Sequence, residues 1–214
     1  MSSCASVTTP MTPGLHLSQV DSPQTDEEHA EMADIPYGNA VGALLYLATS
    51  TQPDISFTIT TLCRFIANPG IKHWNTVKHL FHYLQGTKDA RLVYQHNLFD
   101  PHGIFTVYCD TDHAGNVDNG CSTGGYALLI ANAAVSWSSH LQTITALSTT
   151  EAEYVSAMDA GKEVAWMRQL LNKFGFTLPG LSTLAMDNQS AISIAKNPEY
   201  HGHMKHLTCV SIAA

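Results

Sequence analysis

Charged residues are scarce in this sequence, and positively charged residues are the scarcest of them. Only 13% of the 214 residues are Asp, Glu, Lys or Arg, and 10 basic side chains against 18 acidic ones give a formal net charge of −8. Proteins that hold DNA or RNA by charge carry the opposite balance, because Lys and Arg bind the phosphates. A carboxylate site that binds Mg²⁺ would account for part of the negative charge, so the balance does not exclude a nucleic-acid function.

Long apolar runs and paired cysteines are also missing. No stretch approaches the roughly 20 apolar residues that are needed to cross a bilayer. The first thirty residues lack the basic start and the apolar centre of a secretory signal. The five cysteines are scattered and form no Cys-x-x-Cys pair, which is typical of reduced thiols and not of a disulfide framework or a zinc site. We therefore expect an intracellular protein, cytoplasmic or nuclear, with no membrane span.

The first hundred residues divide into two parts that differ in composition and in hydrophobic pattern. Residues 1–35 hold several prolines and an acidic run without sustained periodicity, which predicts a flexible lead-in that is mobile or loosely docked. Residues 36–100 carry three apolar stretches at helical spacing, and each stretch ends at a Pro or Gly. This second part is therefore predicted to be a helical segment.

From residue 101 to residue 214 the pattern changes to that of an α/β domain. Strands are expected at 104–110, 124–131, 133–139 and 182–187, and helices at about 149–174 and 188–196. Short connections make the first three strands an antiparallel meander, and the long helix crosses over to place the fourth strand parallel to the first. The predicted fold class is thus α/β with a mixed sheet, preceded by the helical segment.

Three acidic residues occupy positions that simple packing does not explain. Asp110 ends the first predicted strand and Asp187 ends the fourth, and sites form at the carboxyl ends of neighbouring parallel strands. Glu153 lies one turn before the apolar stripe of the long helix, where a carboxylate is costly to bury unless a cation compensates it. Shared carboxylates of this kind hold two Mg²⁺ ions about 4 Å apart in phosphodiester cleavage. The three acids predict a site for Mg²⁺ (or Mn²⁺), with Asp110 as the bridging ligand.

A structural role competes with the metal role for each of these acids. An Asp at a strand end is more often a hydrogen-bond partner of a loop than a metal ligand. Glu151, two residues before Glu153, completes a capping box with Ser148, in which its carboxylate reaches back to the backbone N–H of the cap. We assign Glu153 to chemistry and Glu151 to capping, although helix boundaries predicted from sequence leave the choice between the two open.

Several longer motifs resemble consecutive landmarks of copia-type retrotransposon polyproteins. They are PYGNAVGALLYLATSTQPDISF, HWNTVKHLFHYLQGT, YCDTDHAGNVDNGCSTGGY, AVSWSS, ALSTTEAEY and MDNQSAI. The resemblance covers nearly everything after about residue 15. It implies that residues 36–100 are the helical end of a reverse transcriptase and its connection, and that 101–214 is a ribonuclease H-like domain.

The resemblance also implies an activity and its site. The activity would be cleavage of the RNA strand of an RNA–DNA hybrid by two-metal phosphodiester hydrolysis, with Asp110, Glu153 and Asp187 as the catalytic, metal-binding acids. The implied partners are the hybrid and the reverse transcriptase part of the polyprotein. The implied location is a cytoplasmic virus-like particle or the nucleus.

The last residues depart from the family pattern. Thr208 stands where the family usually has an aspartate, and threonine offers no carboxylate for a metal. The chain also stops before the closing helix and the fifth strand of the fold, which predicts a truncated domain. These departures predict an impaired enzyme, and the alternative to a ribonuclease is a catalytically inactive retroelement relic or a nucleic-acid-binding module.

Overall fold

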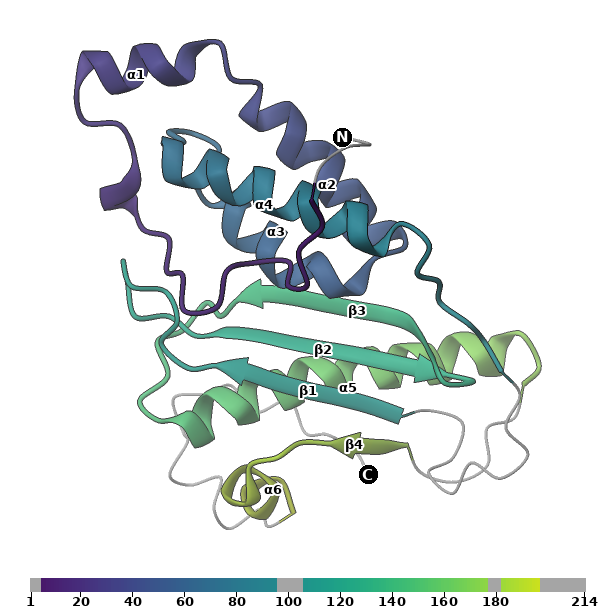
Figure 1. Ribbon diagram of the computed structural model, residues 1–214. Helices are drawn as coiled ribbons and strands as arrows, with labels where there is room; N and C mark the ends of the chain where they lie inside the picture. The colour runs from purple at the N-terminus through teal and green to yellow at the C-terminus, as the bar shows by residue number, and fades with distance from the viewer. Residues whose placement is uncertain (1–4, 96–105, 177–181, 197–214) are drawn as a thin grey trace. The chain divides into compact units, whose positions relative to one another are not determined.

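The computed structural model describes residues 5–95, 106–176 and 182–196 (Figure 1). The chain forms two compact units. The first comprises Met1–Leu92 together with Asn116–Gly120, and the second comprises Val93–Gly115 and Cys121–Ala214. No helix in the described ranges combines the length and the apolarity that crossing a membrane requires.

The first unit is helical. Its elements are η1 (Gln19–Asp21), α1 (Asp26–Ala33), α2 (Tyr37–Ser50), η2 (Pro53–Ile55), α3 (Ser56–Cys63) and α4 (Ile71–Thr87). The three helices predicted from apolar spacing are confirmed as α2, α3 and α4. Their facing sides form a core of fully buried aliphatic residues that includes Leu44, Ile59, Leu62 and Leu80. This is the amphipathic pattern expected when each helix buries one stripe.

The segment expected to be a loosely docked lead-in makes contacts within this helical unit. Leu17 is only 2% exposed and belongs to the core. Asp21 accepts a hydrogen bond from the Lys72 ammonium on α4, at an N–O distance of 2.9 Å. Thr25 caps α1 by accepting from the backbone N–H of Glu28. These contacts come from single residues and leave no periodic signal in the sequence.

The second unit is a mixed sheet with helices. Its elements are β1 (Thr106–Asp112), β2 (Thr123–Ile130), β3 (Ala133–Leu141), α5 (Thr149–Lys173), β4 (Thr183–Ala185) and α6 (Gln189–Lys196). The strand order is β3-β2-β1-β4, with antiparallel pairing of β1, β2 and β3 and parallel pairing of β1 with β4. The predicted meander, crossover helix and mixed sheet are confirmed. The fourth strand is shorter than predicted, since its pairing with β1 ends at Ala185.

Helix α5 runs along one face of this sheet (Figure 1). Val107 and Leu128 point from β1 and β2 into a core that Ala157, Ala160 and Met167 of α5 complete. The small residues at 157 and 160 let the helix lie close to the strands. The core therefore fixes α5 against β1, the strand that carries Asp110.

Gly124 of β2 lies close to a side chain of this helix. A Cβ atom at that position would lie 2.4 Å from Ser156 Oγ on α5. We expect Gly124→Ala to lower the free energy of unfolding by about 1–3 kcal/mol, the usual cost of overpacking, as measured by urea denaturation. Gly125→Ala is the matched control, because its Cβ would meet nothing closer than Ser138 O at 3.3 Å. Equal losses in the two variants would contradict the prediction.

Candidate metal centre

The pairing of β1 with β4 brings two of the predicted acids to the same edge of the sheet. The last registered pair in this parallel ladder is Tyr108 with Ala185. Asp110 and Asp187 each lie two residues beyond that pair, so they occupy equivalent positions along neighbouring chain segments. Both side chains are exposed, as a site that is open to substrate requires.

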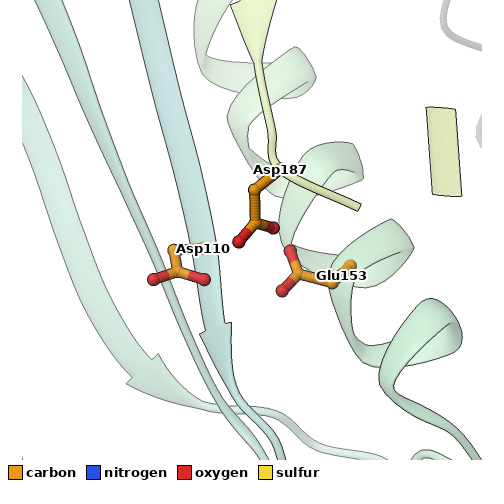
Figure 2. Close-up of side chains that lie close together, drawn as sticks. All are labelled: Asp110, Glu153 and Asp187. Atoms are coloured by element: carbon orange, nitrogen blue, oxygen red, sulfur yellow. The ribbon is translucent and has the colours of Figure 1, made fainter. Parts of the chain in front are cut away.

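Glu153 joins these two acids from α5. It lies in the second turn of the helix and is 7% exposed. One carboxylate oxygen from each of Asp110, Glu153 and Asp187 lies within 4.8 Å of the other two. Figure 2 shows the three side chains gathered around one space from three different parts of the chain. The structure thus brings together all three acids that the sequence singled out.

The environment of this cluster raises the pKa of Glu153. The pKa is raised to about 7, first by burial, then by the neighbouring charges of Asp110 and Asp187 and by a hydrogen bond to the Asp110 carboxylate. The backbone N–H of Thr111 acts in the opposite direction, because it stabilises the carboxylate form. Without a cation, Glu153 therefore holds its proton up to about neutral pH.

Two further features test whether a divalent cation suits the cluster. Glu153 Oε2 is buried and has no hydrogen-bond partner among the described residues, which is costly unless something binds it. The three ligands are carboxylates, and hard cations such as Mg²⁺ and Mn²⁺ prefer oxygen ligands. The residues present fit Mg²⁺ or Mn²⁺, and the positive charge would relieve the repulsion that raises the pKa of Glu153.

Cys109 lies beside the cluster but does not belong to its ligands. Its thiol is directed to the carbonyl oxygen of Ala185, with an S–O distance of 3.8 Å. Burial raises the pKa of Cys109 to about 12, and the charges of Glu153, Asp110 and Asp187 contribute to this increase. A thiol with this pKa stays protonated at neutral pH in the metal-free protein. The group of described residues whose ligand atoms converge consists of the three acids alone, so it offers only oxygen ligands.

Glu151 caps the helix, as predicted, with one difference in its partner. Ser148 Oγ accepts from the backbone N–H of Glu151 at 3.2 Å. The Glu151 carboxylate accepts from the backbone N–H of Leu147 at 2.9 Å, one residue before the predicted partner Ser148. This contact turns the carboxylate of Glu151 to the start of the helix, and the acid in the cluster is Glu153.

Three polar residues beside the cluster were not identified as site residues from the sequence. Thr111 Oγ1 of β1 lies 2.6 Å from Ser156 Oγ of α5 and donates to the carbonyl oxygen of Ala152 at 3.2 Å. Gln142, which follows β3, donates through Nε2 to the same carbonyl at 2.9 Å. No sequence motif marks these residues. The one available signal is that Thr111 and Ala152 directly adjoin Asp110 and Glu153 in the sequence.

Thr208 and the end of the chain lie outside the described residues. The expected effect of threonine at that position and the expected truncation after strand 182–187 therefore have no structural counterpart in residues 182–196. The cluster of Asp110, Glu153 and Asp187 is defined without them.

A mixed sheet of order β3-β2-β1-β4, with a crossover helix on one face and acids on β1, on that helix and after β4, defines a ribonuclease H-like α/β fold. No family model matches the chain. The chain is 41% identical over 207 residues to the "Retrovirus-related Pol polyprotein from transposon TNT 1-94" of Nicotiana tabacum, and 97% of the chain is covered. It is 36% and 33% identical to the corresponding polyproteins from transposons RE2 and RE1 of Arabidopsis thaliana, over 80% and 94% of the chain.

The chain belongs to the copia-type retrotransposon Pol polyproteins. It corresponds to a segment of them, because it spans only 12–15% of the length of these three relatives.

Proposed function

We propose that the second unit of this chain cleaves the RNA strand of an RNA–DNA hybrid by hydrolysis that depends on Mg²⁺ or Mn²⁺. The observation that carries the proposal is the convergence of Asp110, Glu153 and Asp187, with ligand oxygens within 4.8 Å of one another, on a ribonuclease H-like sheet. The kinship with retrotransposon polyproteins supports it, since these elements copy RNA into DNA and so produce such hybrids.

Each acid has a distinct part in this proposal. Asp110 and Asp187 are exposed and would share a bound cation with an incoming phosphate. Glu153 would hold the cation from the buried side. Bound Mg²⁺ would activate a water molecule and stabilise the leaving oxygen of the phosphodiester. Release of the Glu153 proton, which the pKa of about 7 allows near neutral pH, supplies the third negative charge.

The charge of the cluster also explains why the proposed reaction needs a cation. The negative charge of this cluster of acids repels a phosphodiester, and the chain as a whole carries a net charge of −8. The cation would therefore both attract the phosphate and hold it against the acids. A metal-free protein is expected to bind the hybrid weakly.

The proposal extends to partners and place. The hybrid is the substrate, and the reverse transcriptase part of the same polyprotein, of which residues 36–100 would be the helical end, is the partner that supplies it. The proposed setting is a cytoplasmic virus-like particle or the nucleus, where the element copies its RNA.

The test is a cleavage assay on matched nucleic acids. The 214-residue chain is expected to cut an end-labelled RNA strand paired with DNA in the presence of Mg²⁺, and to leave the same RNA intact when it is single-stranded or paired with RNA. EDTA should stop the reaction and added Mn²⁺ should restore it. No cleavage of the hybrid by folded protein, or equal cleavage of all three substrates, would contradict the proposed function.

A further inference from the structure

A polar cluster, with two of its three side chains buried, joins the two elements that carry Asp110 and Glu153. It consists of Thr111, Gln142 and Ser156, which we call the latch. Thr111 and Gln142 both donate to the carbonyl oxygen of Ala152, at 3.2 Å and 2.9 Å. Ser156 Oγ lies 2.6 Å from Thr111 Oγ1 and 3.4 Å from Gln142 Nε2. Strands β1 and β3 are thereby tied to the first turns of α5.

The latch directly adjoins two of the proposed metal ligands along the chain. Thr111 follows Asp110 on β1, and Ala152 precedes Glu153 on α5. The hydrogen bond from Thr111 to Ala152 therefore links the residue next to Asp110 with the residue next to Glu153. Because the peptide unit is planar and stiff, a shift of this hydrogen bond would shift the separation of the two carboxylates.

The close approach at Gly124 makes the latch possible. Gly124 is the cross-strand partner of Thr111 in the β1–β2 ladder. A Cβ atom there would lie 2.4 Å from Ser156 Oγ and 3.3 Å from Gln142 Nε2. The missing side chain leaves room for both polar groups between the sheet and the helix.

A glutamine at position 142 is less favourable for stability than an apolar residue if it only fills this space. The side chain is 3% exposed, and its Oε1 atom has no hydrogen-bond partner within the described part of the chain. A buried acceptor without a hydrogen-bond partner lowers the stability of the fold. Leucine has a similar volume and would avoid that cost, so packing alone gives no reason for the amide at this position.

We propose that Thr111, Gln142 and Ser156 are positioning residues that set the spacing of Asp110 and Glu153 and thereby the affinity of the site for Mg²⁺. The inference rests on the proposed metal-dependent function. Residues behind metal ligands change metal affinity by about 10- to 100-fold when they are lost. The latch acts through the backbone of its neighbours and touches neither substrate nor metal.

Mg²⁺ binding in the absence of nucleic acid is the test, measured by isothermal titration calorimetry on the 214-residue chain. Thr111→Val removes the hydroxyl at constant shape, and Gln142→Leu removes the amide. Each is expected to raise the Mg²⁺ dissociation constant about 10-fold or more. Thr111→Ser, which keeps the hydroxyl, is expected to stay within about twofold of the unchanged chain, and the same order is expected for the Mg²⁺ concentration at half-maximal cleavage.

Ser136→Ala separates positioning from general stability. Ser136 Oγ donates to Glu163 Oε1 at 2.6 Å, so this variant loses a hydrogen bond between β3 and α5 that lies outside the latch. It is expected to lower stability while leaving Mg²⁺ affinity unchanged. Wild-type affinity in both Thr111→Val and Gln142→Leu, or an equal loss in Ser136→Ala, would overturn the latch alone. Failure of the unchanged chain to bind Mg²⁺ would overturn the metal site and the latch with it.

Discussion

Replacement of Asp110 by asparagine is expected to reduce Mg²⁺-dependent cleavage of an RNA–DNA hybrid by about 100- to 1000-fold, on the scale of losing one electrostatic group in an active site. Asparagine keeps the size of the side chain but removes the charge that a shared metal ligand needs. Of its two acidic neighbours, Asp110 has the larger charge effect on the pKa of Glu153. Single-turnover cleavage of a labelled hybrid at saturating Mg²⁺ measures the effect.

Asp112→Asn is the matched control for this variant. Asp112 is the last residue of β1, is also exposed, and lies outside the group of three acids. Both changes remove one negative charge from the same strand, so a general effect of net charge on substrate binding would appear in both. Retention of cleavage in Asp110→Asn, or an equal loss in Asp112→Asn, would show that the cluster does not carry the reaction.

Much of the second unit could be predicted because its local signals agree. Alternating β-branched and aromatic residues define β1, and the short connection between β2 and β3 makes them antiparallel. The long helix between β3 and β4 requires a crossover, and this makes β4 parallel to β1. The order of elements therefore determines which strand ends meet.

The acids of the candidate site could be predicted for the same reason. Asp110 and Asp187 lie where two strand signals end, and Glu153 lies in line with the apolar stripe of α5. Each acid conflicts with the role that its position would have in a purely structural element. Such conflicts between local pattern and local chemistry are expected at functional sites.

The latch and the packing of the lead-in could not be predicted in this way. Thr111 and Ser156 are 45 residues apart, and Gln142 follows a strand without any local pattern of its own. Leu17 enters the helical core from a segment that has no period. Contacts of this kind depend on the distance between packed elements, and for the latch the missing side chain of Gly124 permits that distance.

Glu153→Gln is expected to make the metal-free protein more stable than the unchanged chain at pH 8. The ordinary pKa of a glutamate side chain is 4.5, and the pKa of Glu153 in the folded protein is about 7. Below about pH 4.5 the carboxyl group is protonated in both the folded and the unfolded state, and its contribution to stability is fully present. Between about pH 4.5 and 7 the unfolded state ionises first, so stability is lost as pH rises.

Glutamine cannot ionise and avoids this loss. The stability difference in favour of Glu153→Gln should therefore grow between pH 4.5 and 7 and level off above 7, at about 1–2 kcal/mol once the screening of the exposed Asp110 and Asp187 by solvent is allowed for. Urea denaturation in EDTA across this pH range measures it. Glu151→Gln is the matched control, since it removes a carboxylate two residues away but turns the charge-assisted hydrogen bond from the Leu147 N–H into a weaker neutral one, and it should lower stability slightly.

Added Mg²⁺ should reverse the order of the two proteins at pH 8. A ligand that binds only the folded state raises its stability in proportion to the logarithm of the ligand concentration above the dissociation constant. The unchanged chain has three carboxylates for the cation and should gain melting temperature with Mg²⁺, whereas Glu153→Gln has two and should gain little. A flat pH profile for the stability difference would refute the raised pKa. Equal Mg²⁺ gains in both proteins would exclude Glu153 from the metal centre, because its charge would then contribute nothing to binding.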